Sequence, residues 1–435
     1  NLPVIRIKTN NQTANEPVFY LHGGPGYPNV YSPEGASRFN LDDLMESLLA
    51  HHDVVMVGYR GVEGSVSLNA PEVSKVLSSG SDLLSSGTMQ KVGNALYEAF
   101  RRMRDEGIDL DGYTTEEVVD DMETARNALG YERINLIGTS YGTLIGYVYS
   151  VKYPDAIHRS IMAAGTPPHG QVIWESEQID GLLESYSQLW QESPENLAKS
   201  PDIIETIRNV LNKLPQEWNG VPIHPGNVKS MFFNCLYETS KAAQAFDAFI
   251  AAENGDHSGM AFLSFVWGQQ IPTAINFGDL YLKIYSAGIH DPSCDYESEI
   301  SLSKSIMGSP FTKMVFAPAK YLKEPIKTIP KRLIQEQNID VETLFVCGSK
   351  DHNPYALTKN RLLPYYKNGK FVLLSEMGHS DIVYTGRQLD AFYHLASAYY
   401  QDGTVDDSRF LYEPVNFSPL ISFQQMAQKH LKTGD

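Results

Sequence analysis

The segment INLIGTSYGTLIGYVYS, residues 134–150, constrains the fold of this chain more than any other stretch. A short apolar run leads into the glycine-flanked turn GTSYG (138–142), and apolar residues at helical spacing follow. Strand, turn and helix in this order are the context in which G-x-S-x-G forms a sharp turn that presents its serine. Glycines at both ends of the motif allow the strand and the helix to approach closely. We therefore predict that Ser140 projects above the end of a strand, at the N-terminus of a helix.

This motif is short, and a chain of this length should contain it by chance roughly one time in six. An ordinary strand-to-helix turn with a small polar residue would show the same pattern. The motif alone does not distinguish the two interpretations, so the rest of the chain must decide between them.

Short apolar runs alternate with helical patterns in both the first and the last part of the chain. Strands are predicted at 4–8, 18–21, 53–57, 134–137, 160–164, 343–347 and 370–374. This alternation predicts a doubly wound, mostly parallel sheet of the α/β class. The alternation of strands and helices stops at residues 167–335, which are helical in pattern and contain all four tryptophans. We therefore expect a core formed by 1–166 and 336–435, with 167–335 as an inserted helical cap.

Two further polar residues follow predicted strands after Ser140, namely Asp351 and His379. A serine becomes a nucleophile when a base takes its proton and a carboxylate orients that base. Ligand sites in open α/β sheets lie at the carboxyl ends of the strands, where these three residues are expected. Each has a simpler interpretation, since Asp351 suits a turn and His379 is one of 12 histidines. Together they predict a triad of nucleophile, base and orienting acid, whereas Asp381 and Asp390 are expected on a helix.

The loop HGGPG (22–26) follows the second predicted strand. Four glycine or proline residues in succession exceed what a plain turn requires. Glycines allow backbone N–H groups to approach a developing oxyanion closely. We predict that the N–H groups of Gly24 and Tyr141 form an oxyanion hole.

The composition excludes several classes of function. A formal net charge of −17 and a pI near 5.1 argue against nucleic acid or an anionic membrane as the main partner. No apolar run reaches the length of a membrane-spanning helix. No P-loop or G-x-G-x-x-G occurs, and three cysteines do not make a zinc site or a disulfide framework. No metal or organic cofactor is expected, and a Cys235–Cys294 bridge is left open.

The chain begins with Asn1 and enters a strand almost at once, so we expect a processed or trimmed N-terminus. The compartment, cytoplasmic or exported, and the oligomeric state are left open.

The loop at 22–26 and the motif GTSYGT (138–143) resemble the α/β-hydrolase proline iminopeptidase family and its tripeptidyl-aminopeptidase-like branch. The likeness extends over YTT (113–115), NALGY (127–131) and the residues around Asp351 and His379. It implies an α/β-hydrolase fold and an enzyme that releases N-terminal residues from short peptides. It also implies a cap carboxylate that holds the substrate ammonium group. Asp279 aligns with such a residue, and Glu175 and Glu177 are weaker candidates; the alternative for each is a solvated carboxylate.

Two departures from that family stand out. Gly58 and Glu63 replace its usual aspartate and glycine after the third strand, and residues 66–104 contain no cysteine. The hydrogen bonding of the loop after Val57 is therefore left open. Two other functions remain: a carboxylesterase acting on small acyl esters, and a ligand-binding protein that uses the fold without catalysis.

Overall fold

The structure is a computed structural model. It describes residues 1–11, 15–30, 47–165, 174–287, 305–323, 326–384 and 387–431. The core strands are β1 (Val4–Ile7), β2 (Asn15–Leu21), β3 (His52–Val57), β6 (Ile134–Thr139), β7 (Ile157–Ala163), β10 (Glu342–Gly348) and β11 (Gly369–Leu374). All seven predicted core strands are confirmed, with ends shifted by up to three residues.

These strands form one sheet in the order β1-β3-β2-β6-β7-β10-β11. β1 runs antiparallel to β3, and every other neighbouring pair is parallel. The strand order reverses at β2, which pairs with β3 on one side and with β6 on the other. Crossovers on the two sides of such a reversal place helices on both faces of the sheet. The predicted doubly wound, mostly parallel sheet is therefore confirmed.

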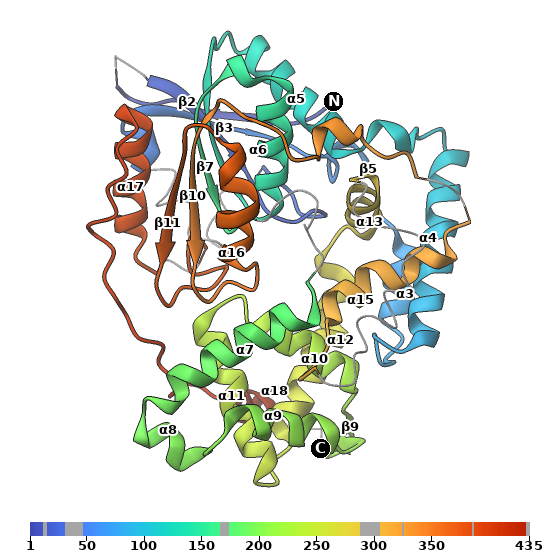
Figure 1. Cartoon of the computed structure of the whole chain (residues 1–435). Coiled ribbons are helices and arrows are strands. Elements are labelled where there is room, and N and C mark those ends of the chain that lie inside the picture. The colour runs from blue at the N-terminus through green and yellow to red at the C-terminus, as the bar shows by residue number, and fades with distance from the viewer. Residues whose placement is uncertain are drawn as a thin grey trace.

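Side chains of β2 alternate between the two faces of the sheet. Phe19 and Leu21 join the cluster that contains the apolar residues of α5 (Thr115–Ala128) and α6 (Tyr141–Lys152). Val18 and Tyr20 join the opposite cluster with α17 (Leu389–Asp402). Both sets are buried, because a parallel sheet covered by helices exposes neither face to water. Figure 1 shows α17 on one side of the sheet and α5 and α6 on the other.

The cap is helical; most of it lies beyond one end of the sheet, and its helix at 277–286 lies beside the sheet (Figure 1). Its helices are α7 (Ser176–Gln191), α8 (Pro194–Lys199), α9 (Ile203–Asn212), α10 (Pro225–Cys235), α11 (Thr239–Glu253), α12 (Ser258–Ala274), α13 (Phe277–Ser286) and α15 (Pro310–Phe316). Two-residue strands β8 (Glu217–Trp218) and β9 (Val221–Pro222) form a small hairpin. Most of α7 to α12 share one apolar cluster.

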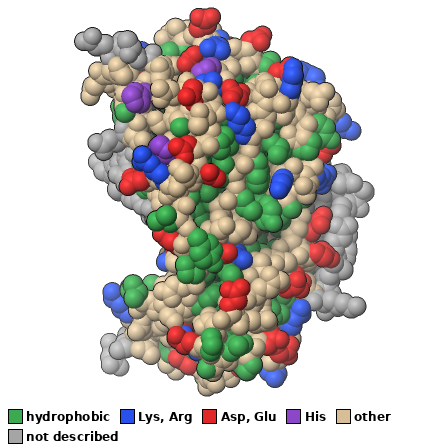
Figure 2. Space-filling model, turned by 60° about the vertical axis from the view of Figure 1, so that its left-hand side comes forward, with side chains coloured by type: hydrophobic (Ala, Val, Ile, Leu, Met, Phe, Trp, Pro, Cys, Tyr) green, Lys and Arg blue, Asp and Glu red, His purple; other side chains and the backbone are tan. Residues whose placement is uncertain are grey.

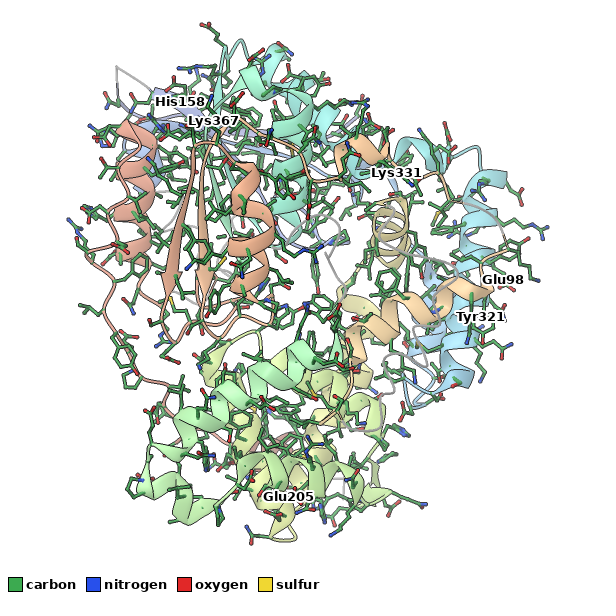
Figure 3. The ribbon with its side chains drawn as sticks, viewed as in Figure 1. Glu98, His158, Glu205, Tyr321, Lys331 and Lys367 are labelled. Atoms are coloured by element: carbon green, nitrogen blue, oxygen red, sulfur yellow. The ribbon has the colours of Figure 1, made fainter. Side chains whose placement is uncertain are left out.

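Two segments that the sequence assigned to the core pack against the cap. Helices α3 (Pro71–Leu77) and α4 (Ser86–Asp105) share an apolar cluster with α13 and α15. In Figure 3, Glu98 on α4 and Tyr321 lie together on this side. Helix α18 (Phe423–His430) packs on α12 and α11, so the chain beyond α17 leaves the core. These three helices therefore bury their apolar faces against helices of the segment 167–335.

The core and the cap meet at the carboxyl ends of the parallel strands. His158, near the start of β7, and Lys367, just before β11, mark the opposite end of the sheet, and Glu205 marks α9 in the cap (Figure 3). Figure 2 shows the outline narrowing where the two parts join. Within the described ranges, no helix combines the length and apolarity that a membrane span requires.

Candidate active site

Ser140 lies at the sharp turn between β6 and α6. Its backbone has φ 54° and ψ −119°, a region that non-glycine residues rarely occupy. A Cβ at Gly138 would lie 2.7 Å from the carbonyl oxygen of Gly142, and a Cβ at Gly142 would lie 2.1 Å from that of Leu21. The two glycines therefore permit the close approach that the strained turn requires. The predicted strand, turn and helix around Ser140 are confirmed.

The glycine-rich loop after β2 lies directly beside Ser140. A Cβ at Gly23 would come within 3.1 Å of the Ser140 Cβ, and Gly24 has a φ of 133°. Gly24 and Ser140 line the same cavity. Tyr141 is the first residue of α6, a position whose backbone N–H has no partner within the helix. The structure thus places both predicted oxyanion donors next to the serine.

Asp351 and His379 are brought together although 27 residues separate them in the chain. Nδ1 of His379 lies 2.9 Å from Oδ1 of Asp351, and both side chains are buried. The same oxygen accepts a hydrogen bond from the N–H of Asn353 at 2.8 Å. The Asn353 side chain in turn donates to the Ala164 carbonyl and accepts from the Trp174 indole at 2.8 Å. The carboxylate is therefore fixed from the core and from the cap.

Asp381 holds the loop that carries His379, a role that the sequence did not reveal. It does not lie on a helix as expected; it is buried in the turn before α17. Its Oδ2 accepts from the N–H of Gly378 at 2.8 Å and from the N–H and hydroxyl of Thr239 at 3.1 and 2.8 Å. Thr239 begins α11, so this carboxylate ties the histidine loop to the cap. An acidic residue three positions after a loop glycine was its only sequence signal.

His352 is a second histidine beside the pair, and it too was missed. Its ring centroid lies 4.5 Å from that of His379 and 3.9 Å from that of Tyr237. Burial lowers the pKa of His352 well below its ordinary value, and the neighbouring His379 adds to that effect. Ligand atoms of Asp351, His352 and His379 lie within 4.8 Å of one another, a grouping that a metal ion would also suit. Within this group, Asp351 and His379 share a hydrogen bond, whereas Nδ1 of His352 lies 3.5 Å from the same Asp351 oxygen.

A cavity of about 150 Å³ opens above Ser140. Its described lining is apolar or aromatic apart from two asparagines and the serine itself. The members are Gly24, Pro25, Tyr27, Ser140, Trp174, Asn234, Tyr237, Ile275, Leu280, Ile284, Phe311, Val315 and Asn353. None of these residues is charged. The cavity therefore suits a small, uncharged group next to the bond that Ser140 would attack.

A larger hollow of about 810 Å³ lies between the N-terminal strand and α5. Its lining includes Arg60, Asp109 and Asp121, and it does not include Ser140. Of these two hollows, only the smaller one has Ser140 and Gly24 in its lining.

The three cap carboxylates that the family resemblance suggested, Asp279, Glu175 and Glu177, lie outside the described lining of the cavity above Ser140. Asp279 has no exposed side-chain surface, and its Oδ1 lies 2.6 Å from Nζ of Lys283. It is not among the residues that line the cavity. Glu175 is exposed and precedes α7, where its N–H donates to the Gln178 side chain at 3.2 Å. Glu177 is exposed in the first turn of the same helix.

Glu63, one of the departures from the family pattern, organises the loop after β3. Its carboxylate accepts from the backbone N–H groups of Asn29 at 2.7 Å, Val30 at 2.9 Å and Tyr59 at 2.8 Å. Asn29 in turn accepts from the N–H of His22 at 2.8 Å. Burial raises the pKa of Glu63 despite these donors. Glu63 thus connects the loop after β3 to the start of the loop at 22–26.

Cys235 and Cys347 are buried free thiols. Burial raises the pKa of each to about 12, so neither is a ready nucleophile at neutral pH. Cys294 lies outside the described residues, so the structure does not test a Cys235–Cys294 bridge.

Comparison with known proteins agrees with this architecture. Residues 16–229 match the family model described as alpha/beta hydrolase fold. The match includes β2, the loop at 22–26 and the Ser140 turn. Together with the sheet and the strained serine turn, the match shows that the chain has the α/β-hydrolase fold.

Among curated proteins, the chain is similar to two tripeptidyl aminopeptidases. It is 28% identical over 173 residues to that of Streptomyces lividans, which covers 38% of this chain and 31% of the relative. It is 27% identical over 173 residues to that of Streptomyces coelicolor, which covers 38% of this chain and 30% of the relative. The chain thus spans less than a third of the length of these relatives.

Among solved structures, the chain matches the α/β-hydrolase enzyme MGS-M2 from a deep-sea metagenome library, at 13% identity and a TM-score of 0.41. That match covers 93% of this chain and 96% of the other. The meta-cleavage product hydrolase CumD of Pseudomonas fluorescens IP01 matches at 12% identity and a TM-score of 0.42, covering 93% and 95%.

Proposed function

We propose that this protein is a serine hydrolase in which Ser140 is the nucleophile, His379 the general base and Asp351 the residue that orients the base. The observation that carries this proposal is the 2.9 Å contact between His379 and Asp351 at the strand ends beside the strained Ser140 turn. Asp351 occupies Nδ1 of His379, which leaves Nε2 as the nitrogen that can take a proton from the serine hydroxyl. Ser140, His379 and Asp351 would then act as nucleophile, base and orienting acid in that order.

In the first half-reaction, Oγ of Ser140 forms a bond to the substrate carbonyl carbon, and its proton passes to Nε2 of His379. The backbone N–H groups of Gly24 and Tyr141 donate to the oxygen that becomes negatively charged. The bond to the leaving amine or alcohol then breaks, and His379 transfers the proton to that leaving group. The product is an acyl group esterified to Ser140.

In the second half-reaction, His379 takes a proton from water, and the hydroxide attacks the acyl carbon. The ester bond to Oγ breaks, and the proton returns to Ser140 through His379. The acid is released and the enzyme is restored. No step of this scheme uses a metal ion or an organic cofactor.

The leading substrate class is a short peptide with a free N-terminus, cleaved as by an aminopeptidase of the proline iminopeptidase type. The similarity to the two tripeptidyl aminopeptidases supports this choice, as do the family motifs at 22–26 and 138–143. The uncharged cavity suits an apolar residue such as proline next to the scissile carbonyl.

A carboxylesterase is the second candidate, and a specific observation favours it. No charged residue is found among the described residues that line the cavity. An ammonium group placed there would lack the paired carboxylate that such a buried charge requires. A small uncharged acyl ester has no such requirement.

The nucleophile is tested with a fluorophosphonate probe on the wild type and on Ser140→Ala. We expect the wild type to be labelled and the variant to remain unlabelled. An unlabelled wild type would contradict the proposal and would favour a ligand-binding protein that uses the fold without catalysis.

The substrate class is tested by turnover of aminoacyl and tripeptidyl amides alongside p-nitrophenyl esters. We expect cleavage of amides that carry a free N-terminus. Cleavage of esters without any amide cleavage would reject the peptidase and support the esterase. An N-acetylated amide cleaved as fast as its free-amine counterpart would reject recognition of the N-terminus.

A further inference from the structure

Helix α13 contains a pair of opposite charges that are fully withdrawn from water. Asp279 and Lys283 lie one turn apart, with Oδ1 and Nζ separated by 2.6 Å and neither side chain exposed. Apolar residues of similar volume often stabilise a fold as well as a buried ion pair does, because desolvating two charges is costly. Stability alone therefore does not account for this pair, and its hydrogen bonds to neighbouring loops indicate a second role.

The aspartate contacts the loop that carries the proposed oxyanion donor. Oδ2 of Asp279 accepts a hydrogen bond from the backbone N–H of Gly26 at 3.1 Å. The N–H of Asn276, just before the helix, donates to the Gly26 carbonyl at 3.0 Å. Both backbone groups of Gly26 are thus held by the start of α13, two residues from Gly24.

Helix α13 and the residue before it also hold the loop after β3. Nζ of Lys283 donates to the Arg60 carbonyl at 3.0 Å, and the Asn276 side chain donates to the Gly61 carbonyl at 3.0 Å. A Cβ at Gly61 would lie 2.5 Å from Oδ1 of Asp279, so the loop passes directly over the carboxylate. Two loops at the carboxyl edge of the sheet are therefore fixed by one helix of the cap.

We propose that Asp279 is a positioning residue, which fixes the loop at 22–26 so that the Gly24 N–H is held in line with the oxyanion formed at Ser140. This inference rests on the proposed serine hydrolase. It replaces the role suggested by family resemblance, in which Asp279 would bind the substrate ammonium group. A carboxylate already paired with Lys283 and Gly26 has little capacity left for a substrate cation. Small displacements of an oxyanion donor are costly, because the donor must meet the charge without reorganising.

Two double variants separate these roles. Asp279→Asn with Lys283→Met removes both charges but keeps an amide oxygen that can accept from the Gly26 N–H. Asp279→Leu with Lys283→Met removes both charges and that acceptor. The two proteins therefore differ in the hydrogen bond to Gly26 and share the loss of any ammonium-binding charge. Each is assayed against an amide with a free N-terminus and against a p-nitrophenyl ester without an amine, and its melting temperature is measured.

We expect the leucine variant to lose at least about ten-fold in kcat on both substrates, with KM changed by less than about three-fold. The asparagine variant should recover most of that loss on both substrates. Equal kcat values for the two variants would overturn the proposal. A loss confined to the free-amine substrate, in both variants, would assign Asp279 to the ammonium group and would also overturn it. These results leave the serine hydrolase intact, whereas a wild type that reacts with neither substrate nor fluorophosphonate rejects both proposals.

A variant on the loop side keeps the test decisive if the leucine variant fails to fold. A Cβ at Gly26 would lie 2.6 Å from Cγ2 of Ile275, so Gly26→Ala pushes the loop away from α13. It should lower kcat on both substrates and leave KM nearly unchanged. Unchanged kcat in this folded variant would overturn the proposal.

Discussion

The rings of His352 and His379 lie 4.5 Å apart, and both direct Nδ1 toward the same oxygen of Asp351. The distance from Oδ1 is 2.9 Å for His379 and 3.5 Å for His352. The shorter distance is that of a charge-assisted hydrogen bond, and the longer one exceeds the usual range. Asp351 therefore orients His379, whereas His352 packs beside it as a neutral aromatic ring.

Replacing Asp351 by asparagine should lower kcat by about 10³- to 10⁴-fold, because an amide neither fixes the productive tautomer of His379 nor stabilises its charge. The melting temperature should change little, since the side chains have the same shape. Steady-state kinetics and thermal unfolding check this together. A kcat within ten-fold of the wild type would mean that another carboxylate orients the base.

Acid should destabilise this protein through its buried histidines. Burial lowers the pKa of His22 to about 4, and the pKa of His352 is also lowered by burial. The unfolded chain, with a histidine pKa of about 6.5, binds more protons in this window, so the free energy of unfolding falls as the pH decreases from 6.5 toward 4. His22 alone accounts for about 3 kcal/mol of that loss.

His352→Phe keeps the aromatic packing and removes one of these groups. The variant should show a flatter decrease of unfolding free energy between pH 6.5 and 4, measured by urea denaturation. The pH dependence of the unfolding free energy that remains in this variant comes from His22 and other titrating groups. A slope identical to that of the wild type would show that His352 is not held neutral in the fold.

Removing the carboxylate of Asp381 should weaken both stability and turnover. In Asp381→Ala, three donors from Gly378 and Thr239 lose their acceptor, which costs about 2–4 kcal/mol in a buried site. The His379 loop then loses its tie to α11, and kcat should fall several-fold or more. Asp390→Ala, an exposed position in the first turn of α17, is the matched control and should change neither quantity appreciably. Equal effects at the two positions would contradict the assignment.

The glycine after the nucleophile should not tolerate a methyl group. A Cβ at Gly142 would lie 2.1 Å from the Leu21 carbonyl oxygen, so Gly142→Ala must displace β2 or α6 and should cost more than about 2 kcal/mol. At Gly87 in α4 a Cβ meets nothing within 4 Å, and Gly87→Ala should be neutral or stabilising by up to about 1 kcal/mol. Chemical denaturation of the pair measures the contrast. A neutral Gly142→Ala would show that the turn is looser than described.

Local pattern was sufficient for the strands of the core and for the turn at Ser140. Apolar runs bounded by glycine and polar residues predicted the strands, most of them buried and parallel, and β1 is the antiparallel exception. The spacing of Gly138 and Gly142 follows from backbone sterics. Asp351 and His379 could be paired in advance because parallel strands end at one edge of the sheet.

The tertiary structure decided which charges face one another. Asp279 could be aligned with a substrate ligand from sequence, yet its carboxylate is paired with Lys283 and with the N–H of Gly26, more than 250 residues away in the chain. From the sequence, Asp381 was expected on a helix. In the structure its carboxylate accepts hydrogen bonds from Gly378 and Thr239 and so holds the histidine loop against the cap. Sequence patterns report secondary structure because it depends on near neighbours. The partner of a buried carboxylate depends on how distant segments pack, and no local pattern contains that information.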